Sequence, residues 1–262
     1  MRFFKKRMNI LALGGGSARG LCSIGVLKVL EKYFGRGKIP FEMFIGTSIG
    51  SLIGASYCLG MSVEELEHRV GEFSWPKMVD FGIYSTAMIK GDRLEEIIKD
   101  CVGKRGFSDM KIPFALTTTD IETGEELIHD SGDLVKLLRA SCSWPGIFTA
   151  VEIDKRLLVD GGVRNSIPTK AARKYGATRI LAVDPGFAVK NQKMTNVLRV
   201  MVQAVQIMGE ELNTYQSRQA DLIIKPDLKD IDQFDFDKSA YIIKMGEVAA
   251  ENVIKTIETH FA

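Results

Sequence analysis

The pentapeptide Gly46-Thr-Ser-Ile-Gly50 places Ser48 between two glycines at the spacing of a G-x-S-x-G motif. It follows the short predicted strand 41–45 and precedes the apolar, small-residue stretch 49–59, which predicts a buried helix after a tight turn. A serine on such a turn projects from the sheet edge, and the dipole of the following helix favours negative charge beside it. This setting is typical of a nucleophile. The alternative is that Ser48 only caps the helix.

A second glycine-rich segment, Gly14–Gly20, lies between a predicted strand at 8–13 and a predicted helix at 21–33. Backbone N–H groups in such a loop can hold an anion, either the phosphate of a dinucleotide or the oxyanion of an ester's tetrahedral intermediate. A dinucleotide loop needs the spacing G-x-G-x-x-G and an acidic residue at the end of the next strand. Ser17 and Arg19 interrupt that spacing, and the next strand ends in the serine motif. We therefore favour the oxyanion hole.

A third candidate is Asp160, which follows the apolar run 157–159 and precedes two glycines. An Asp-Gly pair is also a favoured turn, so this motif alone does not decide between chemistry and structure. A histidine base is not predicted, because the three histidines lie outside glycine-bearing loops: His68, His129 and His260. An aspartate within hydrogen-bond reach can accept a serine proton instead.

In order and spacing, segments 11–21, 46–50 and 160–162 together resemble the patatin-like phospholipases. The resemblance covers most of the chain, and four further segments look like those of bacterial members: Leu27–Glu31, Ser141–Gly146, Ile167-Pro168 and Phe234–Asp237. The family resemblance implies a Ser–Asp dyad that works without histidine. Ser48 would be the nucleophile and Asp160 the general base.

The resemblance also implies roles for the glycine-rich motifs. Backbone N–H groups near Gly15, Gly16 and Ser17 would form the oxyanion hole, and Arg19 would hold this loop or a substrate phosphate. The remaining motif residues are Gly20, Gly46, Gly50, Gly161 and Gly162. The family usually has a glycine where this chain has Ser17, which leaves the shape of the loop open. A serine still donates its N–H if its backbone angles are allowed.

Strands alternate with helices along the chain, which predicts an α/β fold with a largely parallel central sheet. A length of 262 residues fits one domain. We therefore expect a single three-layer α/β/α patatin-like domain over residues 1–262. Its core motifs lie in 8–170, and the helices and strand of 171–262 complete the fold, among them helices at 166–175 and 241–257.

Three segments are open to more than one interpretation. The predicted helix 197–212 has one apolar face, for which packing in the core is favoured over a lipid or partner surface. That face consists of Leu198, Met201, Val202, Val205, Met208 and Leu212. The stretch 73–91 lacks periodicity and is expected to be a loop or partial cap. The acid-rich stretch 227–237 lacks the mid-loop glycine and terminal glutamate of a calcium loop, so a solvated surface loop is expected.

Composition and charge limit the partners. A net charge of +2 gives no basis for nucleic-acid binding, and no run of about 18 apolar residues predicts a transmembrane helix. The basic segment 1–7 lacks the apolar stretch of a signal peptide, and a solvated tail is favoured over contact with anionic lipid. Four widely spaced cysteines are expected to be reduced and mostly buried, and no histidine lies at metal-ligand spacing. We expect a cytoplasmic protein, at most peripheral to a membrane, with neither metal nor cofactor.

The activity that the resemblance implies is hydrolysis of a phospholipid, lysophospholipid or other fatty-acyl ester through an acyl-enzyme. The partner would be this lipid, with transient contact at a membrane surface. The apolar residues of 73–89, with Trp144, Ile147 and Phe148, are candidates to line an acyl pocket, although core packing explains them nearly as well. Two alternatives stay open: an acyltransferase that passes the acyl group to a lipid, and a non-catalytic lipid-binding or regulatory protein with the same fold.

Overall fold

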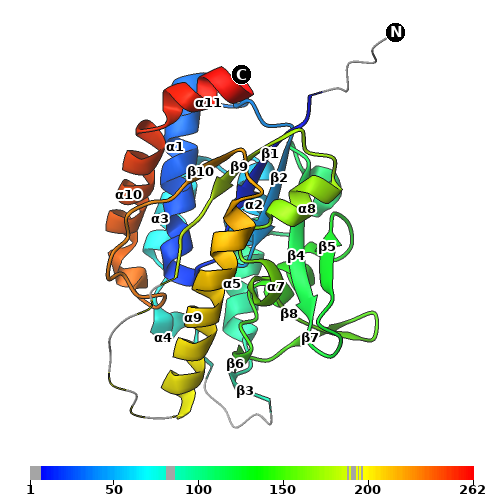
Figure 1. The fold of residues 1–262 in the computed structure, drawn as a ribbon. Helices are drawn as coiled ribbons and strands as arrows, with labels where there is room; N and C mark the ends of the chain where they lie inside the picture. The colour runs from blue at the N-terminus through cyan, green and yellow to red at the C-terminus, as the bar shows by residue number, and fades with distance from the viewer. Residues whose placement is uncertain (1–6, 81–85, 188, 190–192, 194, 196) are drawn as a thin grey trace.

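A mixed sheet forms the centre of the protein (Figure 1). The computed structural model describes residues 7–80, 86–187, 189, 193, 195 and 197–262. Within them the sheet contains β1 (Asn9–Leu13), β2 (Met43–Thr47), β4 (Phe114–Asp120), β5 (Glu126–His129), β7 (Val151–Ile153), β8 (Arg156–Asp160), β9 (Arg179–Val183) and β10 (Leu222–Ile224). The strand order is β10-β9-β1-β2-β4-β8-β7, and β5 also pairs with β4. The strands from β10 to β4 are parallel, whereas β5, β8 and β7 join antiparallel.

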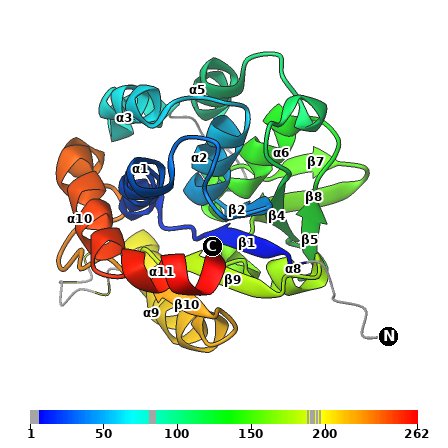
Figure 2. The same ribbon diagram turned by 90° about the horizontal axis from the view of Figure 1, so that it is seen from above.

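Helices cover both faces of this sheet, so the expected three-layer α/β fold is confirmed (Figure 2). One layer contains α1 (Cys22–Phe34), α2 (Ile49–Cys58), α3 (Val63–Gly71), α5 (Asp92–Val102), α6 (Leu134–Ser141) and α10 (Ser239–Glu251). The other contains α7 (Gly162–Asn165), α8 (Thr169–Lys174) and α9 (Val197–Ser217). The remaining elements are α4 (Trp75–Met78), α11 (Ile254–Phe261), the small sheet of β3 (Ala87–Ile89) and β6 (Gly146–Phe148), and the 3-10 turns η1 (Ser17–Leu21), η2 (Phe107–Asp109) and η3 (Phe236–Lys238).

Strand β1 shows why both faces are covered. Its residues are apolar without alternation, and successive side chains of a strand point to opposite faces. Leu11 and Leu13 belong to the large core beneath α1 and α2, whereas Ile10 and Ala12 belong to the smaller core beneath α8. All four side chains are fully buried. A strand of this kind requires helices on both sides.

Two glycines let the C-terminal helix α10 lie directly on α1. A Cβ added at Gly25 would overlap the carbonyl oxygen of Ile243, and one added at Gly246 would overlap the carbonyl oxygen of Cys22. The two backbones therefore approach more closely than larger side chains would allow. This contact joins the beginning of the chain to its end.

Several expected elements differ in the structure. The stretch 73–91 contains the short helix α4 and the strand β3, which pairs with the distant β6; residues 81–85 lie outside the described residues. The expected closing helix ends at Glu251 and a second helix, α11, follows. The helix expected at 166–175 is limited to α8, and the short α7 precedes it. Of the basic N-terminal segment, the structure describes only Arg7, which donates to the carbonyl of Ala262.

The largest correction concerns α9, whose apolar face was expected to pack in the core. The side of this helix next to the apolar face is the buried one, with Gln206 and Asn213 at 2% and 5% exposure. Asn213 donates to the Asp184 carboxylate at 3.1 Å, and Gly209 lies against the ring of Phe187. Gly209 and Asn213 give α9 its inner face. Val202 also packs against the core, whereas Met201, Val205, Met208 and Leu212 are left exposed.

Candidate active site

Ser48 lies at the carboxyl end of β2, on the turn into α2. Its backbone angles, φ 55° and ψ −131°, fall where side chains are rarely accommodated, the strained geometry of a nucleophile on a strand-to-helix turn. The flanking glycines make the turn feasible: a Cβ at Gly46 would overlap Ser51, and one at Gly50 would overlap the carbonyl of Leu13. The positive end of the α2 dipole therefore lies at the Ser48 hydroxyl.

Ser141, at the end of α6, supports this turn. Its Oγ accepts the N–H of Ser48 at 3.0 Å and donates to the carbonyl of Thr117 at 2.9 Å. The Ser51 hydroxyl donates to the Ser48 carbonyl at 2.5 Å. Both backbone polar groups of Ser48 thus have a hydroxyl partner, which holds the strained conformation in place.

Asp160 reaches Ser48 through the strand order. Thr47 at the end of β2 pairs with Thr117 of β4, and Asp160 at the end of β8 pairs with the next β4 residue, Thr118. The last residues of β2 and β8 therefore lie at one level on either side of β4. The Ser48 hydroxyl donates to Oδ2 of Asp160 at 2.6 Å.

The Asp160 carboxylate is buried, with 8% of its surface exposed. Its other oxygen, Oδ1, accepts the N–H of Gly162 at 2.7 Å. Burial raises the pKa of Asp160 to about 6, and the hydrogen bonds from Ser48 and Gly162 oppose that shift. Gly161 is also required by close packing, because a Cβ there would overlap the Thr117 hydroxyl. The arrangement can accept a proton from Ser48 near neutral pH.

The glycine loop after β1 approaches Ser48 from the other side. The N–H of Gly15 donates to the carbonyl of Ser166 at 2.9 Å, so this expected oxyanion donor is engaged within the protein. For the N–H groups of Gly16 and Ser17, no acceptor is found among the described residues. Ser17 has φ 50°, so the serine adopts the left-handed conformation that a glycine takes easily. A Cβ at Gly20 would overlap Ile49, which keeps the loop close to the serine turn.

Arg19 lies beneath this loop and outside the pocket lining. It is 5% exposed, and its guanidinium donates to the carbonyls of Pro185, Gly186 and Ile231 at 2.7–3.1 Å. Desolvation by burial lowers the pKa of Arg19 from its ordinary value. Of the two roles implied for Arg19, this geometry supports holding the loop.

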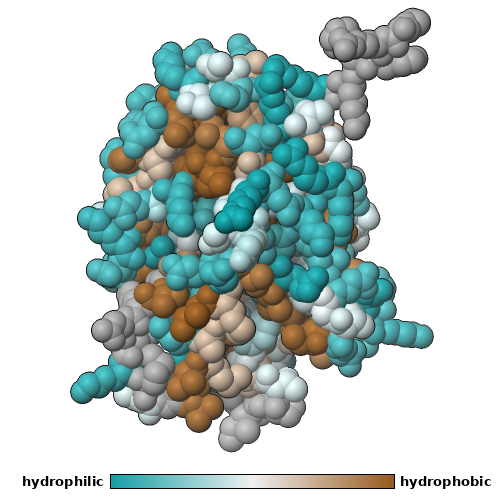
Figure 3. All heavy atoms as spheres, viewed as in Figure 1, coloured by the Kyte–Doolittle hydropathy of each residue, from teal (hydrophilic) through white to brown (hydrophobic). Residues whose placement is uncertain are grey.

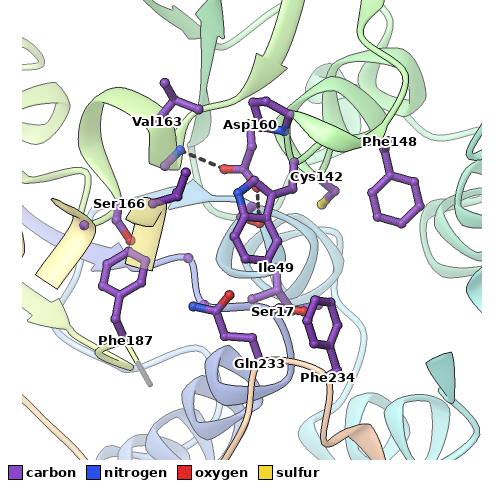
Figure 4. A pocket seen from close by; sticks show the side chains of 18 of the residues that line it. Ser17, Ile49, Cys142, Phe148, Asp160, Val163, Ser166, Phe187, Gln233 and Phe234 are labelled. Carbon is purple, nitrogen blue, oxygen red and sulfur yellow. Dashed lines mark hydrogen bonds between the residues drawn. The ribbon is translucent and has the colours of Figure 1, made fainter. Parts of the chain in front are cut away.

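Ser48 and Asp160 open into a pocket of about 340 Å³ (Figure 4). The apolar residues that line it include four of those expected from the sequence: Phe73, Met78, Trp144 and Phe148. Ile147 is buried and does not line the pocket. Among the lining residues that the structure describes, Asp160 is the only one with a charged side chain. The pocket therefore suits a mainly apolar ligand.

Two parts of the pocket wall were missed by the sequence analysis. One is the acid-rich loop, expected to be solvated, which contributes Gln233 and Phe234; the Phe234 ring stacks on Trp144 at 6.1 Å between centroids. The other is α9, which contributes Val205, Met208 and Leu212. For α9, the sequence signal was its apolar face. For the loop, the signal was the presence of two phenylalanines among the aspartates, Phe234 and Phe236, because large aromatic side chains are usually buried.

The histidines lie outside the pocket, and of the four cysteines only Cys142 lines it. His68 and His260 are exposed, and His129 bonds Thr118 on the edge of the sheet; none lines the pocket. Three cysteines are buried and Cys142 is partly buried, all of them free. Within the described ranges no cluster of side chains is arranged to hold a metal ion. Every described helix falls short of the length or apolarity needed to cross a bilayer.

Comparison with known proteins gives matches in sequence. A family model of patatin-like phospholipases matches residues 11–173, more than half of the chain. Neuropathy target esterase sws of Drosophila melanogaster is 33% identical over 184 residues, covering 67% of this chain and 13% of the relative. Human patatin-like phospholipase domain-containing protein 6 is 34% identical over 186 residues, with the same coverage. Lysophospholipase NTE1 of the yeast Scheffersomyces stipitis is 32% identical over 184 residues, covering 68% and 12%.

The chain thus spans about an eighth of the length of these curated relatives.

Solved structures share the fold at low sequence identity. VipD from Legionella pneumophila superposes with a TM-score of 0.65 at 11% identity, covering 95% of this chain and 67% of that one. The type III effector ExoU gives a TM-score of 0.52 at 11% identity, covering 96% and 53%.

Proposed function

Because the chain belongs to the patatin-like phospholipase family, we propose that it hydrolyses fatty-acyl esters of lipids, with Ser48 as nucleophile and Asp160 as general base. The observation that carries this proposal is the hydrogen bond of 2.6 Å from the Ser48 hydroxyl to the carboxylate of the buried Asp160, both of which line an apolar pocket. A short bond of this kind sets up proton transfer as the hydroxyl attacks.

In the first step, Ser48 Oγ attacks the ester carbonyl carbon while its proton passes to Asp160 Oδ2. The carbonyl oxygen becomes an oxyanion, which accepts hydrogen bonds from the N–H groups of Gly16 and Ser17. Collapse breaks the bond to the alcohol, which leaves with the proton from Asp160. Water then attacks the acyl-enzyme with Asp160 again as base, the fatty acid is released, and Ser48 recovers its proton.

The substrate class follows from the pocket and from the relatives. The apolar lining fits a fatty-acyl chain, and relatives in the sequence comparison are named lysophospholipase and esterase. We take a phospholipid or lysophospholipid as the substrate of this chain too. The sequence relatives described above come from an insect, human and yeast, so the narrower resemblance to bacterial members remains a prediction.

Helix α9 supports contact with a membrane surface. Its exposed apolar face includes Val205, Met208 and Leu212, which also line the pocket, so the two surfaces are continuous. Figure 3 shows hydrophobic side chains gathered along α9 in the lower half of the view. A lipid substrate resides in a bilayer, and an amphipathic helix binds a bilayer through its apolar face. We propose that this face of α9 meets the membrane from which the substrate enters, which makes the protein peripheral.

The proposed dyad is tested with a soluble medium-chain p-nitrophenyl ester. Ser48→Ala should abolish p-nitrophenol release and labelling by a fluorophosphonate probe, because both need the nucleophile. Unchanged turnover in Ser48→Ala would reject the dyad. Product analysis with an added alcohol distinguishes hydrolysis from acyl transfer, and a wild-type chain that neither turns over nor labels would be a non-catalytic lipid-binding protein.

A further inference from the structure

Gln233 is a buried residue whose carboxamide faces the pocket. Its side chain is 3% exposed and lines the same pocket as Ser48 and Asp160. In Figure 4 the carboxamide projects from its own loop into the pocket interior. In the part of the chain that the structure describes, no hydrogen bond to its side-chain nitrogen or oxygen is found.

The surrounding loop holds Gln233 in place. The N–H of Ala18, next to the oxyanion loop, donates to the Gln233 carbonyl at 3.0 Å. Arg19 donates to the carbonyl of Ile231 at 2.7 Å, and the next ring, Phe234, stacks on Trp144. The backbone of Gln233 is therefore held against the residue that follows Ser17, one of the proposed oxyanion donors, and its side chain enters the same pocket.

The carboxamide atoms of Gln233 are not sealed in the protein interior but reach the pocket, so their hydrogen bonds can be completed by what the pocket holds. A pocket with such a polar group on its wall is suited to a ligand that forms hydrogen bonds with that group. A carboxamide both donates and accepts, which matches a neutral hydroxyl. No described lining residue is cationic, so the pocket offers no counter-charge for a phosphate at this point.

We propose that Gln233 determines specificity by binding a free hydroxyl next to the scissile ester, as in a monoacyl glycerolipid. The hydroxyl donates to Oε1 and accepts from Nε2–H of Gln233. Acylation of that hydroxyl removes the donor and adds bulk, so a diacyl lipid leaves the carboxamide half-satisfied. This inference rests on the proposed hydrolase activity.

The test compares two esters that differ only in this hydroxyl: a 1-acylglycerol and the monoester of propane-1,3-diol with the same acyl chain. We expect Gln233→Ala to lower kcat/KM for the acylglycerol about 10- to 100-fold and to change the diol monoester less than about twofold. The wild type should prefer the acylglycerol by the same factor. Asp230→Asn, at an exposed position of the same loop, should change neither substrate.

Equal losses on both esters, or no loss on either, would overturn the inference while leaving the hydrolase proposal intact. The absence of Ser48-dependent hydrolysis of both esters by the wild type would instead overturn the proposed function. Binding measured in the Ser48→Ala background gives a readout without turnover. There Gln233→Ala should weaken binding of the acylglycerol about tenfold or more and leave the diol monoester unchanged; equal affinities would reject the role of Gln233.

Discussion

At the scale of single residues, the proposed base sets the pH dependence. Burial raises the pKa of Asp160 to about 6, and only the ionised carboxylate accepts a proton from Ser48. We expect kcat/KM for a p-nitrophenyl ester to rise tenfold per pH unit below about pH 6 and to level off above it. The measurement is a pH–rate profile with enzyme shown to be folded at each pH. A profile that is flat from pH 4 to 8 would show that a group other than Asp160 accepts the proton of Ser48.

The same raised pKa predicts an effect on stability. A folded-state pKa above the unfolded value means that the protonated form is favoured by folding, and this contribution is lost as the pH rises through about 6. At pH 8 the buried carboxylate therefore costs on the order of 3 kcal/mol. Asp160→Asn should raise the free energy of unfolding at pH 8 by about that amount and by little at pH 4, while abolishing activity. Urea denaturation at both pH values measures this, and a destabilised variant at pH 8 would contradict it.

Ser141 is predicted to position the nucleophile without touching the substrate. Ser141→Ala leaves the N–H of Ser48 without its acceptor and loosens the strained turn. We expect kcat to fall about tenfold with KM nearly unchanged, since an unsatisfied buried group costs about 1–3 kcal/mol. The matched control is Ser56→Ala, a buried serine of α2 whose hydroxyl finds no hydrogen-bond partner among the described residues. This variant should keep wild-type kinetics. A rise in KM alone would assign Ser141 to substrate binding.

At the scale of elements, the outward face of α9 carries the prediction for membrane contact. Val197 and Met201 are 75% and 58% exposed and do not line the pocket. Replacing both with Glu should lower binding to phosphatidylcholine vesicles about tenfold, because apolar area available to the bilayer is lost. Hydrolysis of a soluble ester should stay unchanged. Thr214→Glu, on the polar side of the same helix, is the control, and equal vesicle binding by all three proteins would reject α9 as the contact.

The sequence predicts most elements correctly, and its errors have physical causes. The strand, turn and helix around Ser48 and the sequence position of Asp160 follow from local patterns. Their meeting depends on β8 joining β4 antiparallel, a pairing that is set by contacts distant in sequence. The helical spacing of apolar residues in α9 identifies its apolar face but does not show which face is buried. The buried side is set by contacts with other segments, those of Asn213 with Asp184 and of Gly209 with Phe187. Gln233 was missed because its aspartate neighbours suggested a solvated loop.

At the scale of the whole molecule, the family match ends at residue 173, but the fold does not. Beyond it, β9 pairs along the full length of β1, α10 packs on α1, and the loop with Gln233 closes the pocket. Without these parts, the second edge of β1 and the apolar face of α1 would be exposed to water. We propose that residues 1–262 form one cooperative domain.

This proposal predicts a single unfolding transition for the full chain. Circular dichroism, tryptophan fluorescence and loss of esterase activity should share one midpoint in urea, because the N-terminal motifs and the C-terminal elements share the core around α1 and β1. A chain of residues 1–173 should lack cooperative unfolding, since it loses the partners of β1 and α1 on one side. Two separated midpoints, or a folded and active 1–173 chain, would show instead that the C-terminal part is an independent addition to a complete hydrolase core.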